Sequence, residues 1–457
     1  MDKMADVLGR VGAWCGQNKY LSAIKNSFQT FMPLTIAGAI GVLWCNVLVN
    51  ADSGLGMFWK PIMALEVINP AFAAMQFATI SCITVGITFG IAQEIGEANG
   101  ETGYFAGLLG LACWLAVTQS GWANYALVDT AKQTLELTAD GALQTFTGVA
   151  GGALGATGLF TGMIVGVVSV EIFCALRKVE GLKLKMPETV PPGVARAFEV
   201  LIPAVITLAI IALIGRGCEL ATGLYLNDVI STYIQGPLGA IGATVPGVII
   251  IYIIIMLFWL VGIHGNNMLA AVKEPIFKPM LYANTALFTD GKSVPLTPEI
   301  KAHGYYTFNL GMMQMFAEWG GCGVTLGLVI AIFIFSKRED NRAIATLSIV
   351  PGLFNINETV TFGIPLVLNP ILGIPFILAP ALCIGLGYLL VTMKFCPPVV
   401  LEVPWTMPPI LLGFLATGGN IMGAVSQIIA IAFATVIYIP FLIAYEKYQN
   451  KQAAAAE

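Results

Sequence analysis

Charged side chains are scarce in this chain. Asp, Glu, Lys and Arg make up 11% of its 457 residues, against roughly 25% in an average soluble domain. Hydrophobic residues make up 57%. A soluble protein of this length needs more charge to cover its surface, whereas lipid-facing helices need none in their middles. The composition therefore excludes an ordinary soluble domain and predicts an all-α polytopic membrane protein.

The signatures of several chemistries are also absent from the sequence. The net charge of −4 is spread along the chain and provides no basic face for nucleic acid. The nine cysteines stand singly, without zinc-ligand spacing, and we interpret them as small buried hydrophobes. Neither a P-loop nor an HExxH motif occurs. We therefore expect no metal, no cofactor and no nucleic-acid partner. The first residues lack a signal-peptide pattern, so we expect no cleaved leader.

Apolar stretches long enough to cross a hydrocarbon core of about 30 Å recur along the chain. We expect spans near residues 27–50, 72–92, 104–120, 147–176, 197–215, 244–263, 371–392 and 421–444. Shorter passes near 304–317 and 322–336 bring the prediction to about ten transmembrane helices. The segments 351–370 and 397–420 are apolar but broken by Pro, Gly and Asn, which is typical of re-entrant hairpins.

Most lysines and arginines fall on one side of this arrangement. With ten crossings, all but four of the 22 lie at the ends, in 177–196, in 264–303 (including Lys273 and Lys278) and in 337–342. Because translocated loops are poor in Lys and Arg, we expect both termini in the cytoplasm. The polar, proline-containing segment 177–196 is predicted to be a cytoplasmic linker between an N-terminal half, 1–176, and a C-terminal half, 197–457.

Two ionisable residues in apolar surroundings are functional candidates, because such groups cost several kcal/mol in a membrane unless they are paired or wetted. His264 ends a long apolar run between Gly262 and Gly265, which let the backbone approach a ligand closely. The alternative is a histidine hydrogen-bonded at a helix end. Glu358 follows Asn357 in the broken segment 351–370, and the alternative there is a carboxylate that caps its own loop.

Trp405 is held in an extended, proline-rich turn. Pro404 and Pro408 preclude an ordinary helix around it. An indole fixed in this way can stack on the apolar face of a sugar ring or lie in the interfacial aromatic belt, which is the commoner fate. Glu318 and Glu402 lie in short turns, and we expect both at the membrane interface.

Several of these segments resemble one known family, the lactose, cellobiose and N,N'-diacetylchitobiose enzyme IIC permeases of the bacterial phosphotransferase system. The run Gly-Gly-Cys-Gly-Val-Thr-Leu-Gly-Leu at 320–328 is similar to the family's Gly-Gly-Ser-Gly-x-Thr-Leu-Gly-Leu. Thr359, where proline is common, and Cys322, where serine is usual, depart from the family pattern. The other matching runs are 23–26, 32–38, 262–265, 355–358, 362–365, 368–370, 403–409 and 413–419.

The resemblance implies a multi-pass permease of the bacterial cytoplasmic (inner) membrane. Such a permease binds a β-linked disaccharide near mid-membrane, surrounded by lipid, and presents its 6-hydroxyl to a soluble phosphorylated IIB protein. We expect that protein, with its phosphocysteine, to be a separate partner. The resemblance further implies a homodimer formed by the first half and a sugar site in the second half.

The resemblance and the chemistry together suggest roles for six residues. Glu358 is predicted to accept the hydroxyl proton, since phosphoryl transfer depends on alignment and charge stabilisation. His264 would orient the same hydroxyl or stabilise charge on the phosphoryl oxygens. By the resemblance, Trp259, Asn267, Asn357 and Trp405 would line the sugar pocket. Two alternatives remain: a proton-coupled secondary transporter with Glu358 and His264 as its proton relay, and a channel-like or structural membrane protein without coupled chemistry.

Overall fold

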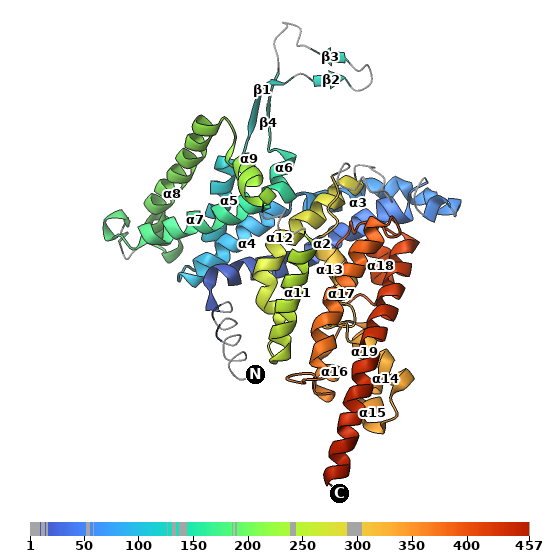
Figure 1. Cartoon of the computed structure of the whole chain (residues 1–457). Coiled ribbons are helices and arrows are strands. Elements are labelled where there is room, and N and C mark those ends of the chain that lie inside the picture. The colour runs from blue at the N-terminus through green and yellow to red at the C-terminus, as the bar shows by residue number, and fades with distance from the viewer. Residues whose placement is uncertain are drawn as a thin grey trace. The chain divides into compact units, whose positions relative to one another are not determined.

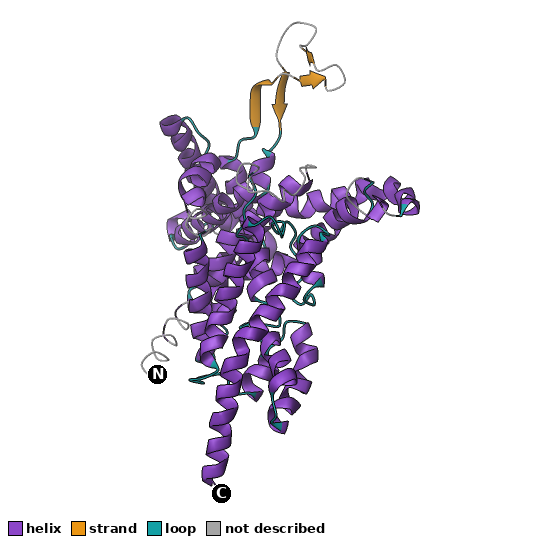
Figure 2. Cartoon of the chain, turned by 45° about the vertical axis from the view of Figure 1, so that its right-hand side comes forward, coloured by secondary structure: helices purple, strands orange, loops and turns teal. Residues whose placement is uncertain are grey.

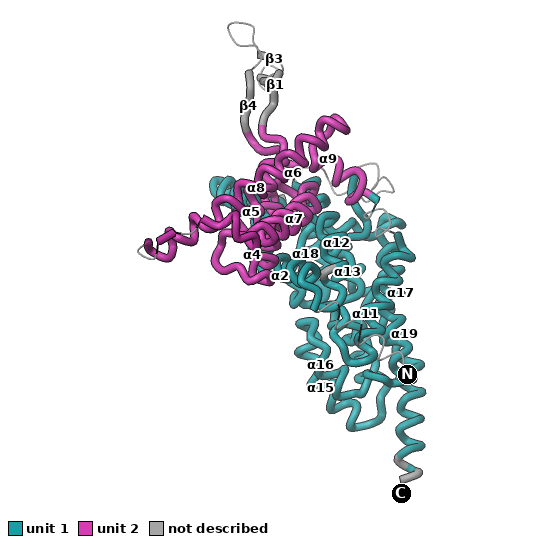
Figure 3. The backbone as a smooth tube through the Cα atoms, turned by 90° about the vertical axis from the view of Figure 1, so that its left-hand side faces the viewer, with its two compact units in different colours: residues 1–80, 237–457 teal, residues 81–236 magenta. Residues whose placement is uncertain are grey.

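The protein is predominantly helical in its computed structural model (Figure 1). The structure describes residues 10, 14, 17–51, 55–57, 59–125, 127–129, 134–136, 144–184, 186–187, 190–237, 244–289 and 304–456. Figure 3 shows its two compact units. Unit 1 is formed within residues 1–80 and 237–457, and unit 2 within residues 81–236.

Unit 2 is a group of helices that pack closely through small residues. On Gly162 in α7, a Cβ atom would lie 2.2 Å from the hydroxyl oxygen of Thr88 in α4. On Gly110 in α5, a Cβ atom would lie 2.4 Å from that of Ala92. Small residues of this kind let membrane helices approach closely. The helices are α4 (Ile83–Ala98), α5 (Phe105–Val117), α6 (Gly151–Leu154), α7 (Leu159–Arg177), α8 (Pro192–Thr222) and α9 (Leu226–Ile230).

Unit 2 also contains four short strands that the all-α expectation did not include (Figure 2). β1 (Gly121–Tyr125) pairs antiparallel with β4 (Gln144–Thr147), and β2 (Leu127–Asp129) with β3 (Thr134–Glu136). They lie in the polar stretch between two apolar runs. Short strands of three to five residues have too little periodicity to be recognised in such a stretch.

Unit 1 combines long helices with short ones joined by irregular loops. α2 continues into a π-helical turn, Trp44–Leu48, and α3 follows a 3₁₀ segment, Lys60–Ile68. The helices are α2 (Lys19–Leu43), α3 (Asn69–Gln76), α11 (Val245–Leu260), α12 (Gly265–Thr289), α13 (Leu310–Ala317), α14 (Leu326–Phe335), α15 (Glu339–Leu353), α16 (Glu358–Gly363), α17 (Gly373–Thr392), α18 (Leu411–Ala416) and α19 (Ile421–Ala456).

Apolar helices of membrane-spanning length confirm the polytopic class. Six described runs are long and apolar enough to cross a bilayer: Lys19–Leu48, Lys60–Ser81, Ala156–Arg177, Pro192–Thr222, Gly373–Thr392 and Ile421–Gln452. Three shorter apolar helices are α5, α11 and α14.

One expected span differs from the structure. The stretch 72–92 is not a single helix: Cys82, with φ −110° and ψ 22°, separates the run Lys60–Ser81 from α4. An unbroken apolar sequence carries no signal for such a break. The compact units divide the chain at other positions than 177–196, a segment in which α8 begins at Pro192. That 177–196 is a cytoplasmic linker between two transmembrane halves stays a prediction. Packing of α2 against α12 joins the first segment of the chain to the last, and composition cannot reveal that contact.

The two broken segments are irregular as predicted. Within 351–370, α15 ends at Leu353, Asn355 adopts φ +63°, and the short helix α16 follows. Within 397–420, only α18 is helical, after a long non-helical stretch. That either segment is re-entrant in the membrane stays a prediction.

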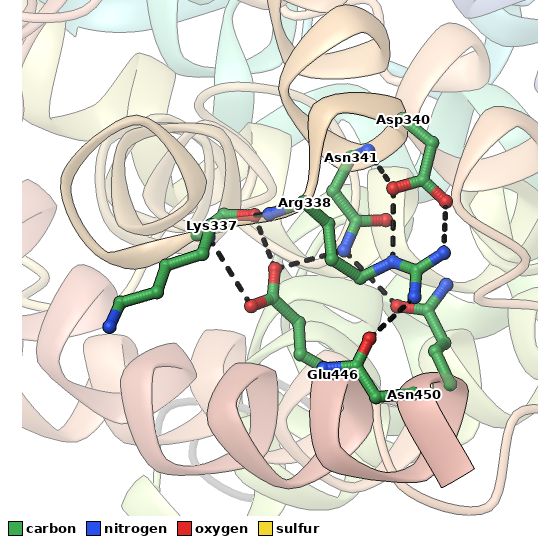
Figure 4. Close-up of polar contacts among 8 residues, drawn as sticks. Lys337, Arg338, Asp340, Asn341, Glu446 and Asn450 are labelled. Carbon is green, nitrogen blue, oxygen red and sulfur yellow. Dashed lines mark hydrogen bonds and ion pairs between the residues drawn. The ribbon is translucent and has the colours of Figure 1, made fainter. Parts of the chain in front are cut away.

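The turn between α14 and α15 is tied to the last helix by polar side chains (Figure 4). The Asn341 side-chain amide donates to Oε1 of Glu446 at 3.0 Å, and the Arg338 guanidinium donates to Oδ1 of Asn450 at 2.7 Å. Arg338 also donates to both carboxylate oxygens of Asp340, which lowers the pKa of that carboxyl below its ordinary value. Two segments that the distribution of Lys and Arg assigns to the same side of the membrane therefore lie in contact.

Candidate functional site: a polar cavity in unit 1

A cavity of about 650 Å³ lies within unit 1. Its volume falls within the range of roughly 300–1,000 Å³ that is usual for small-molecule sites. Residues of α2, α12 and α13 line it, together with the loops before α16 and α18. Five of the six predicted site residues are among those that line it: His264, Asn267, Asn357, Glu358 and Trp405.

His264 lies directly before α12, at a backbone turn that needs glycine. Gly262 has φ +81°, and a Cβ atom on Gly265 would lie 2.0 Å from the carbonyl oxygen of Ile255. The Nδ1 atom of His264 accepts the backbone N–H of Asn267 at 3.3 Å. A neutral ring in this arrangement carries its proton on Nε2, where it can be donated to a ligand. The histidine therefore caps the helix, as the alternative expectation held, and also borders the cavity.

Glu358 is the first residue of α16, and its side chain is exposed to the cavity. The loop before it is fixed by two asparagines. Asn355 accepts the backbone N–H of Gly320 at 2.7 Å and donates to the carbonyl oxygen of Met407 at 3.0 Å. Asn357 donates to the carbonyl oxygen of Cys322 at 2.8 Å. These hydrogen bonds join three loops that are distant in sequence, and they hold the backbone that carries Glu358 in place.

The two tryptophans are placed differently. Trp405 lines the cavity and is 48% exposed, so its ring has a face for a ligand. Trp259 does not line the cavity: it is buried, and its ring centroid lies 4.5 Å from that of His264 at an angle of 50°. The Trp259 ring therefore packs against the ring of His264. The structure does not place Trp259 among the residues that line the cavity, where the resemblance implied that it would lie.

Sequence reasoning missed two clusters of charged residues in the cavity wall. We call Lys273, Glu318 and Tyr252 the first triad: Lys273 Nζ and the Tyr252 hydroxyl donate to Oε1 of Glu318 at 2.6 and 2.5 Å. We call Lys278, Glu402 and Tyr282 the second triad. There Lys278 Nζ lies 3.6 Å from Oε1 of Glu402, and Tyr282 donates to Oε2 at 2.7 Å.

The two triads bear on several expectations. Glu318 and Glu402, which were expected at the membrane interface, are buried within unit 1, with side chains 14% and 5% exposed. Lys273 and Lys278 belong to α12 and are buried, so they do not contribute to the charge bias of a cytoplasmic loop. One signal was available in the sequence, since Glu274 and Lys278 have the i, i+4 spacing of a helical ion pair. The other histidine, His303, lies outside the described residues.

Comparisons with known proteins cover most or all of the chain and agree with one another. The family model described as "Phosphotransferase system, EIIC" matches residues 25–380. The chain is 31% identical to the PTS system oligo-beta-mannoside-specific EIIC component of Bacillus subtilis (strain 168), over 100% of this chain and 98% of that protein. It is also 31% identical to the PTS system cellobiose-specific EIIC component of Lactococcus lactis subsp. lactis (strain IL1403), over 98% of each. Its fold is similar to the crystal structure of the transporter ChbC, the IIC component from the N,N'-diacetylchitobiose-specific phosphotransferase system, with a TM-score of 0.83 and 30% identity over 98% of each chain.

Proposed function

Because the chain belongs to the EIIC components of the phosphotransferase system, which are multi-pass sugar permeases, we propose that its cavity binds a β-linked disaccharide. Relatives of nearly the same length carry names that specify oligo-β-mannosides, cellobiose and N,N'-diacetylchitobiose. A disaccharide of the cellobiose, chitobiose or lactose type is therefore the proposed substrate. A separate phosphorylated IIB protein is the proposed phosphoryl donor. The alternative of a proton-coupled transporter has no support in the family to which the chain belongs.

The observation that carries this proposal is that His264 and Glu358, far apart in the sequence, line one cavity. In the proposed reaction, the 6-hydroxyl oxygen of the sugar forms a bond to phosphorus while the bond to the IIB cysteine sulfur breaks. Glu358 accepts the hydroxyl proton. His264 donates from Nε2 and so orients the hydroxyl or stabilises charge on the phosphoryl oxygens.

The other residues around this pair have proposed supporting roles. Trp405 offers a ring face for stacking on a sugar, and Asn267 offers a side-chain amide for its hydroxyls. Asn357 contributes to the wall, but its amide N–H groups donate to Cys322 and Thr361, so we propose that it chiefly fixes the loop. Trp259 holds the ring of His264.

The orientation and the assembly also stay proposals. The contacts between the 337–342 turn and α19 support placing the C-terminal helix end on the cytoplasmic side, where a IIB protein would act. We further propose that residues 1–176 contribute the interface of a homodimer in the lipid bilayer, as the family resemblance implied.

Glu358→Gln tests the proposed chemistry. The variant keeps the shape of the side chain but cannot accept a proton, so we expect phosphorylation to fall by about 10²–10⁴-fold while disaccharide affinity changes by about threefold or less. Binding of radiolabelled disaccharides to the purified protein and transfer from phosphorylated IIB in membrane vesicles would measure the two effects.

Glu339→Gln is a matched control, because Glu339 is also the first residue of a helix and is exposed outside the cavity. It should transport and phosphorylate normally. Phosphorylation by Glu358→Gln at the rate of the unmodified protein would show that the base has been assigned to the wrong residue.

A further inference from the structure

The two triads contain the same residue types but satisfy their carboxylates differently. Among the described residues, the hydrogen bonds donated to the Glu318 carboxylate, from Tyr252 and Lys273, both end on Oε1. The Glu402 carboxylate is engaged at both oxygens, Oε1 by Lys278 and Oε2 by Tyr282. The second triad is therefore closed, whereas the first keeps one carboxylate oxygen available.

The available oxygen belongs to a residue that borders the cavity. Glu318 and Lys273 are both in the cavity wall, and their side chains are 14% and 6% exposed. An ionised carboxylate has about four lone-pair sites, and a charged pair removed from water is costly unless further hydrogen bonds compensate for the lost hydration. A ligand that donates a hydrogen bond to Oε2 would supply that compensation.

The carboxylate is also held in a fixed position before any ligand arrives. Tyr252 in α11 is fully buried, and its hydroxyl donates a hydrogen bond to Oε1 of Glu318. Lys273 Nζ lies 3.4 Å from Oδ1 of Asn266, whose amide donates to the sulfur of Cys322 at 3.3 Å. These contacts hold the Glu318 and Lys273 side chains in one conformation before a ligand arrives. Binding therefore loses less conformational entropy of these side chains.

We propose that Glu318 is a further substrate-binding residue, whose Oε2 accepts a hydrogen bond from a sugar hydroxyl while Lys273 and Tyr252 hold Oε1. Lys273 lies about 9 Å along the axis of α12 from Asn267, at a rise of 1.5 Å per residue. The proposed contact of Glu318 is with a hydroxyl other than the one that is phosphorylated. Glu318 acts in binding and specificity and not in the phosphoryl transfer itself. This inference rests on the proposed function, since it assumes that the cavity binds a disaccharide.

Glu318→Gln tests the proposal directly. The glutamine oxygen can still accept from Lys273 and Tyr252, but its NH₂ group replaces the acceptor that faces the sugar. Hydrogen bonds to charged groups are strong enough that we expect disaccharide affinity to fall by about tenfold or more. Phosphorylation at saturating sugar should stay within about twofold, because Glu318 does not touch the reacting atoms.

Glu446→Gln is the matched control. It makes the same chemical change at a carboxylate of α19 that lies outside the cavity and accepts hydrogen bonds at both oxygens, and we expect it to lower thermal stability while disaccharide affinity changes by less than about twofold. If both variants lose affinity equally, Glu318 has only a structural role and the proposal is overturned.

A panel of monodeoxy disaccharides separates a direct contact from a structural effect. With the unmodified protein, one deoxy analogue should bind about tenfold more weakly than the parent sugar. Glu318→Gln should bind that analogue and the parent sugar about equally. A uniform loss across the panel would contradict the direct contact.

Two further measurements keep the test decisive. If Glu318→Gln does not fold, the double variant Lys273→Met with Glu318→Leu removes both charges together, and it should fold and show the same loss of discrimination. If it discriminates among the analogues as the unmodified protein does, the inference is wrong. If the unmodified protein binds none of the parent β-disaccharides, the proposed function is wrong. If the unmodified protein binds a disaccharide and Glu318→Gln binds it equally well, only the role of Glu318 is wrong.

Discussion

The two compact units bury polar groups in opposite ways. In unit 2, the charged cluster lies where helices end: Arg177, the last residue of α7, pairs with Glu199 at 2.8 Å and also with Glu101 in the loop before α5. The helix contacts of unit 2 are made by glycine, alanine and threonine. In unit 1, lysines and glutamates lie within the interior, around the cavity. Unit 2 is thus built for close packing, whereas unit 1 bears the cost of buried charge where a polar ligand can bind.

Removal of one buried charge in unit 1 should have the largest effect. Lys278 lies between Glu402 and Glu274, 3.6 and 3.4 Å from their carboxylate oxygens. Lys278→Met leaves these two carboxylates buried together without a cation. Loss of one partner of a buried pair costs about 3–5 kcal/mol, so we expect a large decrease in the melting temperature of the detergent-solubilised protein.

Lys447→Met, on an exposed part of α19, is the control and should melt as the unmodified protein does. The double variant Lys278→Met with Glu402→Leu should recover part of the loss, since it removes one of the two stranded carboxylates. An unchanged melting temperature for Lys278→Met would contradict the contrast between the two units, because it would show that the stability of unit 1 does not depend on its buried charges.

An added methyl group in unit 2 should have an intermediate effect. On Gly162, a Cβ atom would meet the Thr88 hydroxyl oxygen at 2.2 Å and the Thr84 methyl group at 2.8 Å. Gly162→Ala forces α4 and α7 apart, and overpacking of this kind costs about 1–3 kcal/mol. Disaccharide affinity should be unaffected in the protein that remains folded. Thermal unfolding and sugar binding would measure the two quantities.

Gly217→Ala is matched to that change. Gly217 is also a helical glycine of unit 2, but a Cβ atom there would have nothing within 4 Å. Alanine should stabilise the helix slightly, by about 0.4–1 kcal/mol. If the two alanine variants melt at the same temperature, close packing is not what distinguishes unit 2.

The convergence of His264 and Glu358 on one cavity was predictable because both residues stand out locally. His264 and Glu358 are ionisable residues in apolar or broken segments, and flanking Gly or Asn marks each as an irregular turn. The structure brings both to the cavity. Membrane class was predictable for a similar reason, because hydropathy is a property of each segment and does not depend on its neighbours in space.

The triads were not predictable, because their meaning lies in contacts between distant segments. Lys273 and Lys278 look like loop cations when charges are counted along the sequence. Only the approach of Glu318 and Glu402, from other parts of the chain, makes them interior residues. The position of Trp259 was not predictable for a related reason: proximity to His264 in the sequence does not say that the indole is buried against the imidazole.

Charges outside the cavity should matter least, although unit 1 has these too. Arg338 donates to both oxygens of Asp340, at 3.0 and 2.7 Å, and lowers the pKa of Asp340 from its ordinary value of 3.8. Because the folded-state pKa is the lower one, the stabilisation is present above pH 3.8 and is lost as the pH falls through the folded-state pKa. The pair is exposed and screened, so Asp340→Asn at pH 7 should lower the melting temperature by only about 1 °C.

The pH dependence sharpens this last comparison. The small difference between Asp340→Asn and the unmodified protein should shrink below about pH 4, where the carboxyl of the unfolded state binds a proton more readily than that of the folded state. Melting curves of the two proteins between pH 3 and 7 would measure it. A decrease at pH 7 as large as that of Lys278→Met would mean that the number of charges in unit 1 decides its stability. The expected small decrease would mean instead that their burial around the cavity does.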